Sequence, residues 1–133
     1  MSEVQDVTDP AAVVDAFIAA IERRDMAAAV VHLADDVEYD NVPMGKTVGA
    51  DAVAAALGPF IERCTVVDWP VHRQVADGPI VFNERLDRFQ LGDHWIEMPV
   101  TGVWEVHDGR ITLWRDYFDL ATYTSQMAAA TGG

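Results

Sequence analysis

The order of apolar and polar residues predicts helices in the first half of the chain and strands in the second. Asp9 followed by Pro10 is typical of a helix start, because the carboxylate can accept from free backbone amides and proline fits the first turn. Apolar residues then recur at three- and four-residue spacing to about Arg24, which indicates a helix with one buried face. Asp25 can cap a second, shorter helix through Leu33.

A strand, a loop and a third helix are expected next. The strand is predicted over 37–42 and the loop over 43–49, where proline and glycine gather. The third helix is predicted over 50–64. Gly58 and Pro59 are expected to interrupt or bend it, because proline lacks a backbone donor.

From Thr65 onward the chain carries runs rich in Val, Ile, Phe and Trp, separated by Asp-Gly or Gly-Asp pairs that favour tight turns. The predicted strands are 65–76, 79–91, 94–106 and 110–118. Helices followed by strands are typical of an α+β fold. We expect a curved antiparallel sheet with helices on its concave face and a pocket between the two layers. A short helix and a tail are expected from Ala121.

Composition narrows the class of protein. The 133 residues are 50% hydrophobic, enough for one domain over 1–133 with a single core. The net charge is −13, so nucleic acid and anionic membranes are poor partners and an uncharged substrate fits better. Cys64 is the only cysteine, which excludes an intrachain disulfide and a Cys-based metal cluster. The acidic start without an apolar segment, and the lack of any run long enough to span a bilayer, predict a cytoplasmic protein.

Strand alternation places polar side chains on faces that otherwise look buried. Arg85 and Asp87 share a face with Asn83 and Phe89, because residues two apart point to the same side. Taken alone, an Arg and an Asp at this spacing are most often a surface ion pair. Glu84, between them, points the other way.

Two other strands repeat this pattern. Asp116 shares a face with Trp114 and Phe118, and a carboxylate on such a face needs a partner. Tyr39 and Asn41 share a face of the first strand and by themselves would be ordinary strand residues. It is the combination of the three strands that favours a functional site.

Three motifs together resemble the limonene-1,2-epoxide hydrolase family. They are Tyr39-x-Asn41, Glu84-Arg85-x-Asp87, and the run GRITLWRDYFD over 109–119. The resemblance extends from the first helix to about Tyr123. It implies the cone-shaped α+β fold of the nuclear transport factor 2-like and SnoaL-like superfamily, a mixed or antiparallel curved sheet packed against three to four helices. It also implies a homodimer.

The resemblance further implies a catalytic Asp-Arg-Asp triad that adds water to an epoxide and gives a vicinal diol. Asp116 would be the general base, with Tyr39 and Asn41 holding the attacking water. Asp87 would be the general acid toward the epoxide oxygen, and Arg85 would lie between the two carboxylates. No covalent intermediate, cofactor or metal is required. The apolar composition favours an alicyclic, terpenoid or lipid-derived epoxide.

Charge accounting agrees with these roles. Two ionised carboxylates around one guanidinium would leave a buried net negative charge, so one proton is expected to stay on the pair, and the pair should titrate as one unit. Two other functions remain open on the same fold. A ketosteroid-isomerase-like enzyme would move a proton at carbon with Asp40 or Asp116, and a non-catalytic module would hold a hydrophobic ligand.

The remaining candidates have ordinary structural explanations. The four histidines have no metal-ligand spacing, and the acidic pairs at 35–36 and 38/40 are expected to form a solvated edge. Arg115 is expected to point away from the pocket and to pair with a neighbouring strand. Five apolar residues could line the pocket, although core packing is the simpler interpretation: Met44, Phe60, Trp69, Trp95 and Met98.

Overall fold

Helices and strands make up most of residues 8–132, the part of the chain that this computed structural model describes. In chain order the elements are α1 (Pro10–Glu22), α2 (Met26–Val30), β1 (Leu33–Asn41), β2 (Gly45–Val48), α3 (Ala50–Arg63), β3 (Val66–Asp68), β4 (Val71–Asp77), β5 (Ile80–Leu91), β6 (His94–His107), β7 (Arg110–Tyr117) and α4 (Leu120–Thr131). No helix in this range is both long and apolar enough to cross a membrane. Residues 1–7, part of the acidic start on which the prediction of a cytoplasmic protein partly rests, lie outside it.

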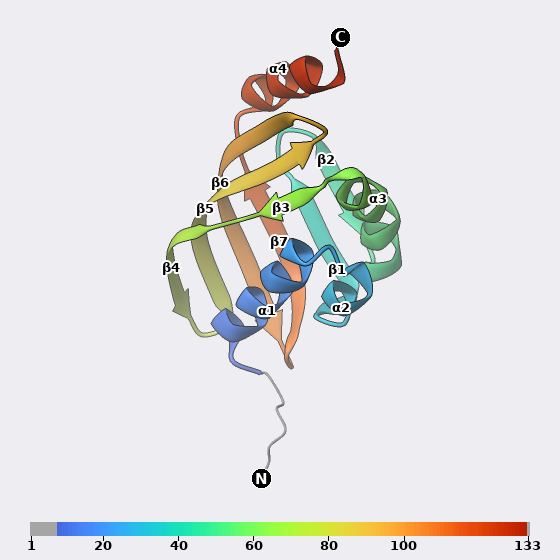
Figure 1. Cartoon of the computed structure of the whole chain (residues 1–133). Coiled ribbons are helices and arrows are strands. Elements are labelled where there is room, and N and C mark those ends of the chain that lie inside the picture. The colour runs from blue at the N-terminus through green and yellow to red at the C-terminus, as the bar shows by residue number, and fades with distance from the viewer. Residues whose placement is uncertain (1–7, 133) are drawn as a thin grey trace.

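The strands form one curled, seven-stranded sheet with the order β2-β1-β7-β6-β5-β3, and β4 also pairs with β5. Neighbouring strands are antiparallel except for β1 and β7, which run parallel. The sheet is therefore mixed. The long strands β5 and β6 bend along their length, as Figure 1 shows, and this bend gives the sheet its curl. This arrangement confirms the expected α+β class.

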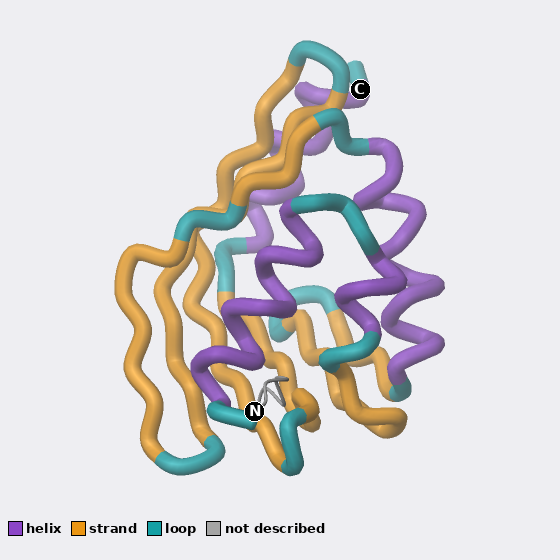
Figure 2. The backbone as a smooth tube through the Cα atoms, turned by 60° about the horizontal axis from the view of Figure 1, so that its bottom comes forward, coloured by secondary structure: helices purple, strands orange, loops and turns teal. Residues whose placement is uncertain are grey.

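The helices cover the concave face of the sheet (Figure 2). Helix α1 packs across β3 to β7, and α3 packs against β1, β2 and α2. The apolar stripe predicted for the first helix is fully or nearly fully buried: Val13, Val14, Phe17, Ile18 and Ile21. Asp9 and Asp25 cap α1 and α2 as expected, by accepting from the backbone amides of Ala12 and Ala28.

The structure corrects several of the predicted boundaries. The second helix ends at Val30 and β1 begins at Leu33, four residues earlier than expected. The predicted loop 43–49 contains β2, which folds back onto β1 through a turn in which Met44 N donates to Asn41 O. Helix α3 continues through Pro59 without interruption.

The predicted strand 65–76 is two strands, and the C-terminal helix is longer than expected. The break lies at Trp69-Pro70, where proline offers no backbone donor, and both pieces pair with β5. Asp119 caps α4, which has 12 residues. In Figure 1 this helix lies at the end of the molecule beyond the turn that joins β5 and β6.

Candidate active site

The site is built on inward-facing residues of β5 and β7. Along β5 every second side chain is buried, and three of these inward positions are polar: Asn83, Arg85 and Asp87. On β7 the same alternation buries Trp114 and Asp116. A strand in the concave layer would normally carry apolar residues at such positions, so four buried polar side chains make this part of the sheet the candidate site.

Arg85 joins the two carboxylates. Its side chain is fully buried. Nε and Nη2 donate to Oδ1 and Oδ2 of Asp87, each at 2.9 Å, which is the two-point geometry of a strong charge-assisted pair. Nη2 also donates to Oδ2 of Asp116 at 3.0 Å. The rings of Trp69 and Trp104 lie 5.4 and 5.6 Å from the guanidinium carbon.

Burial and charge act on this cluster in opposite directions. Burial alone would lower the pKa of Arg85, but Asp116 and Asp87 outweigh it and the net effect raises that pKa. Burial raises the pKa of Asp116 to about 6, with Asp87 adding to the rise and Arg85 opposing it. Burial, reinforced by Asp116, also raises the pKa of Tyr39, so its phenol stays protonated.

One oxygen of Asp116 is free to accept. Oδ1 is buried and accepts no hydrogen bond of ordinary geometry from residues 8–132, and Nε1 of Trp114 is likewise left without a partner of such geometry. The Trp114 side chain acts only as a weak donor that slightly lowers the pKa of Asp116. Asn41 is the register partner of Asp116 across the parallel β1–β7 pair, and Tyr39 is the partner of Trp114, on whose ring it stacks with centroids 3.9 Å apart. The parallel pairing therefore brings the first motif beside the last one.

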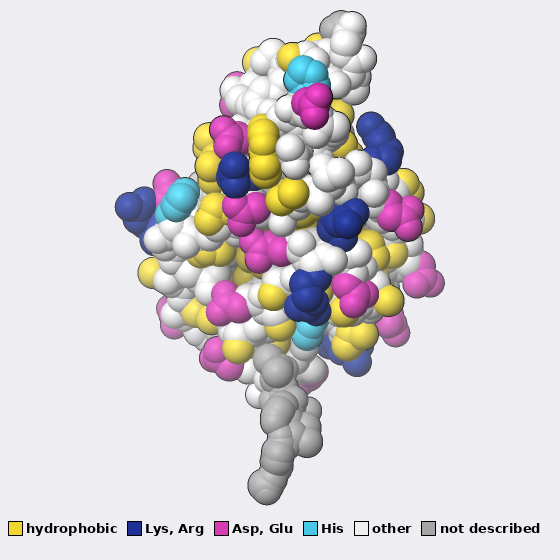
Figure 3. All heavy atoms as spheres, viewed as in Figure 1, with side chains coloured by type: hydrophobic (Ala, Val, Ile, Leu, Met, Phe, Trp, Pro, Cys, Tyr) yellow, Lys and Arg dark blue, Asp and Glu magenta, His cyan; other side chains and the backbone are white. Residues whose placement is uncertain are grey.

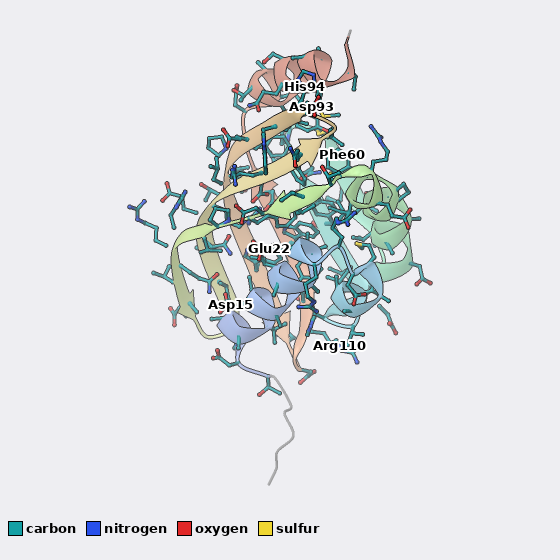
Figure 4. The ribbon with its side chains drawn as sticks, in the orientation of Figure 1. Asp15, Glu22, Phe60, Asp93, His94 and Arg110 are labelled. Carbon is teal, nitrogen blue, oxygen red and sulfur yellow. The ribbon has the colours of Figure 1, made fainter. Side chains whose placement is uncertain are left out.

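Tyr39, Asn41, Asp87 and Asp116 line a mostly apolar cavity of about 270 Å³. Its walls come from the sheet, from α3 and from α4. Residues that line it are Tyr39, Asn41, Met44, Thr47, Ala56, Leu57, Phe60, Trp69, Asp87, Phe89, Met98, Val100, Asp116, Phe118 and Tyr123. Phe60, labelled on α3 in Figure 4, meets Phe89 of β5 edge to face at 5.0 Å and closes one wall.

The structure brings together all five predicted site residues and most of the predicted lining. The exception among the apolar candidates is Trp95, which is partly exposed and stacks under Arg88 at 4.2 Å. Leu57 and Tyr123 were missed as lining residues, because helical periodicity does not say which apolar face meets a cavity. Asn83 was placed on the correct face by alternation, but nothing in the sequence distinguished it as a contact of Arg85.

The opposite face of the sheet carries ordinary ion pairs, as expected. Glu84 pairs with Arg73. Arg115 donates to Asp40 at 3.0 Å and to Glu38 at 3.3 Å, so the predicted acidic edge is partly neutralised by a cation. Within residues 8–132, no three His, Cys, Asp or Glu side chains are grouped as a metal site would require.

Comparison with known proteins agrees with this geometry. The family model of the limonene-1,2-epoxide hydrolase catalytic domain matches residues 8–129. Epoxide hydrolase EphG of Mycobacterium tuberculosis is 39% identical over 107 residues, which are 80% of this chain and 71% of that protein.

Solved structures show the same fold. The structure of an M. tuberculosis epoxide hydrolase described as similar to limonene-1,2-epoxide hydrolase is 34% identical, with a TM-score of 0.79 over 92% of this chain and 95% of that one. A SnoaL-like polyketide cyclase-type protein from Shewanella denitrificans shares the fold with a TM-score of 0.80 at 17% identity, over 90% of this chain and 97% of that one. With the family match spanning all of the site residues, this chain belongs to the limonene-1,2-epoxide hydrolase family.

Proposed function

We propose that this protein hydrolyses an apolar epoxide to a vicinal diol in one general acid-base step. The observation that carries the proposal is a buried guanidinium holding two carboxylates that line a mostly apolar cavity, with one oxygen of Asp116 left free to accept. Membership of an epoxide hydrolase family supports the reaction class.

Asp116 is the general base in this proposal. Its Oδ2 is engaged by Arg85, so Oδ1 is the oxygen that can accept a proton from water. Tyr39 and Asn41 line the same cavity as Asp116 and can hold that water by hydrogen bonds. A general base in this position contributes roughly 10²–10⁴-fold to the rate.

Asp87 is the general acid. The water oxygen bonds to one epoxide carbon while that carbon's bond to oxygen breaks. The water proton passes to Asp116 and the proton of Asp87 passes to the departing oxygen. Both oxygens of Asp87 accept from Arg85, and a protonated carboxyl keeps acceptor capacity for such bonds while its hydroxyl donates elsewhere. The carboxylate pair ends the cycle with one proton, as it began, once that proton returns to Asp87.

Arg85 lowers the energetic cost of burying these charged groups. With one proton on the pair, the single cation balances a single negative charge, and the cluster is neutral. With both carboxylates ionised, the same cluster would carry a net negative charge among Trp69, Trp104 and Trp114. The proton that neutralises the site is the one that the epoxide oxygen needs.

The cavity favours a small apolar substrate. Most of its lining is aliphatic or aromatic, and its volume is just below the roughly 300–1,000 Å³ that is usual for small-molecule sites. Alicyclic, terpenoid and short lipid-derived epoxides share this chemistry, and we propose that the substrate is one of them.

The test is a diol assay with a panel of alicyclic and aliphatic epoxides, wild type beside Asp116→Asn. We expect diol from the wild type and a loss of roughly 10²–10⁴-fold in kcat in the variant. A single turnover in H₂¹⁸O should place ¹⁸O in the first diol formed, because the oxygen comes from water. First-turnover diol that carries unlabelled oxygen would indicate a covalent carboxylate intermediate, and no diol from any epoxide would contradict the proposed function.

We also propose that the protein is a homodimer, which the family resemblance implies. Apolar side chains continue across three strands on the outer face of the sheet: Val75 pairs with Phe82, and Phe82 pairs with Val103. Val75 is 70% exposed and Phe82 is 46% exposed. A patch of this kind on the face away from the helices supports an interface between two copies.

A further inference from the structure

The side of Arg85 that faces away from the carboxylates has its own set of contacts. Nη1 donates to Oδ1 of Asn83 at 2.9 Å. Nε1 of Trp104 donates to the same oxygen at 3.1 Å. Both lone pairs of this amide oxygen are therefore used, and Asn83 itself is only 2% exposed.

The other end of the Asn83 amide is fixed as well. Its Nδ2 donates to Oε1 of Gln74 at 3.0 Å, and Nε2 of Gln74 donates to Asp15 at 3.0 Å. Asp15 lies on α1, where Figure 4 labels it on the side toward β4. A flipped amide would point an NH₂ group at the N–H groups of Arg85 and Trp104, so the chain of contacts allows one orientation only.

Gly102 of β6 provides the space that Arg85 occupies. It pairs with Asn83 on one side and with Asp116 on the other. A Cβ atom at this position would lie 2.4 Å from Nη1 of Arg85, 2.8 Å from Oδ1 of Asn83 and 2.9 Å from Nε1 of Trp104. All three distances are too short for real contacts.

The backbone does not require glycine at this position. Six other glycines have a positive φ, but Gly102 is not among them, so its conformation is one that any residue adopts. Glycine inside a central strand also weakens the strand and packs nothing. The requirement for a missing side chain therefore comes from the guanidinium and its partners.

We propose that Gly102 and Asn83 are positioning residues that form a seat for Arg85 and so set the geometry of the Asp87–Arg85–Asp116 cluster. The neutral amide of Asn83 holds Nη1 of Arg85 without adding a third carboxylate. The absence of a side chain at Gly102 leaves room for the guanidinium to reach both acids. The catalytic consequence rests on the proposed hydrolase function, whereas the placement of Arg85 does not.

Gly102→Ala tests the seat, with Gly58→Ala in α3 as its matched control. A Cβ at Gly58 would meet only Cγ of Met26 at 3.6 Å, an ordinary contact. In Gly102→Ala we expect kcat to fall on the order of 10²-fold, since a displacement of about 1 Å can cost that much, while KM changes little because the apolar walls are intact. Gly58→Ala should keep wild-type values.

The second readout does not depend on activity. The carboxyl ¹³C signal of Asp116, assigned by its absence in Asp116→Asn, reports the pKa of that group by NMR. Arg85 from β5 contacts this carboxylate directly, and Asp87 from β5, Tyr39 from β1 and Tyr123 from α4 are the ionisable groups that line the same cavity. Arg85 lowers this pKa, so moving Arg85 away should raise it in Gly102→Ala and leave it unchanged in Gly58→Ala.

Asn83→Leu is the second variant, which removes the acceptor without adding a clash at Gly102. It should also lower kcat and raise the Asp116 pKa, and it decides the question if Gly102→Ala does not fold. Wild-type kcat and wild-type pKa in a folded Gly102→Ala or Asn83→Leu protein would overturn the proposal. If the wild type hydrolyses no epoxide, the proposed function fails. The comparison of Asp116 pKa values then tests by itself whether Gly102 and Asn83 position Arg85.

Discussion

Asp116 combines a buried position, which favours the protonated carboxyl, with a proposed role as general base, which needs the ionised carboxylate. Burial raises its pKa to about 6, and Arg85 keeps the value from going higher. Because the proposed base must be ionised, kcat/KM should fall as the pH drops through about 6. The pH–rate profile of the wild type measures this limb, and a profile that stays flat below pH 6 would contradict the assignment of Asp116.

The contribution of Asp116 to the free energy of unfolding should change with pH in the direction opposite to kcat/KM. The folded chain binds a proton at Asp116 more tightly than the unfolded chain does, since the pKa is raised from 3.8. The contribution of Asp116 to the free energy of unfolding therefore increases as the pH falls from about 6 toward 4 and is lost again above 6. Other carboxylates titrate in the same range, so the quantity to compare is the difference between wild type and Asp116→Asn in denaturant unfolding.

Single residues also show how far sequence reasoning reaches. Alternation was sufficient to place Arg85 and Asp87 on the same face, because the rule is local to one strand, but taken alone it did not show that this face is buried. The contact between Asn41 and Asp116 required the parallel pairing of β1 with β7, which joins segments 75 residues apart in number and leaves no local pattern. Only the family resemblance linked those motifs before the structure did.

At the scale of elements, α4 closes an edge that the strands leave open. Strand β7 pairs with β6 only as far as Thr101, so the part of β6 before that residue has a free side. Pro99 offers no backbone donor on this free side. The side-chain amide of Gln126 in α4 binds both backbone groups of Glu97: Oε1 accepts from the Glu97 N–H at 2.7 Å, and Nε2 donates to the Glu97 C=O at 2.9 Å.

The two hydrogen bonds between Gln126 and Glu97 should control how firmly α4 is held against the sheet, because the helix has no fully buried residue of its own. Gln126→Leu removes two hydrogen bonds, each worth about 1 kcal/mol, and should speed hydrogen exchange of the α4 amides roughly tenfold or more. Ser125→Ala, which changes only a contact with Thr122 within the helix, is the control. Equal exchange in both variants would show that Phe118 and Tyr123, not Gln126, anchor the helix.

Sequence analysis misjudged elements whose local signals are overridden by contacts with distant parts of the chain. Strand β2 has four residues beside Pro43 and two glycines, so turn signals outweighed its pairing with β1. Gly58 and Pro59 were expected to interrupt or bend α3, but the helix runs from Ala50 to Arg63 without interruption and packs against β1 and β2, and such packing can override a local preference. Long, strongly patterned elements such as α1, β5 and β6 were predicted well because their own periodicity carries the information.

At the scale of the whole molecule, net charge and the outer apolar patch act against each other. Each chain carries a charge of −13, and acidic side chains are spread over the face seen in Figure 3. Two copies therefore repel at long range, while Val75, Phe82 and Val103 offer apolar surface for contact. Salt screens the repulsion within about 10 Å at 0.1 M and leaves the apolar contact intact.

The proposed dimer should accordingly tighten as salt is added, which is opposite to the behaviour of an interface held by ion pairs. Phe82→Asp should shift the protein to monomer at every salt concentration, because it places a charge in the centre of the patch. Val31→Asp is the matched control, since Val31 is 62% exposed and follows α2, away from the three strands of the patch. Sedimentation velocity measures the monomer–dimer equilibrium in each case. If the dimer weakens with salt, or if Phe82→Asp leaves it intact, the interface lies on another surface.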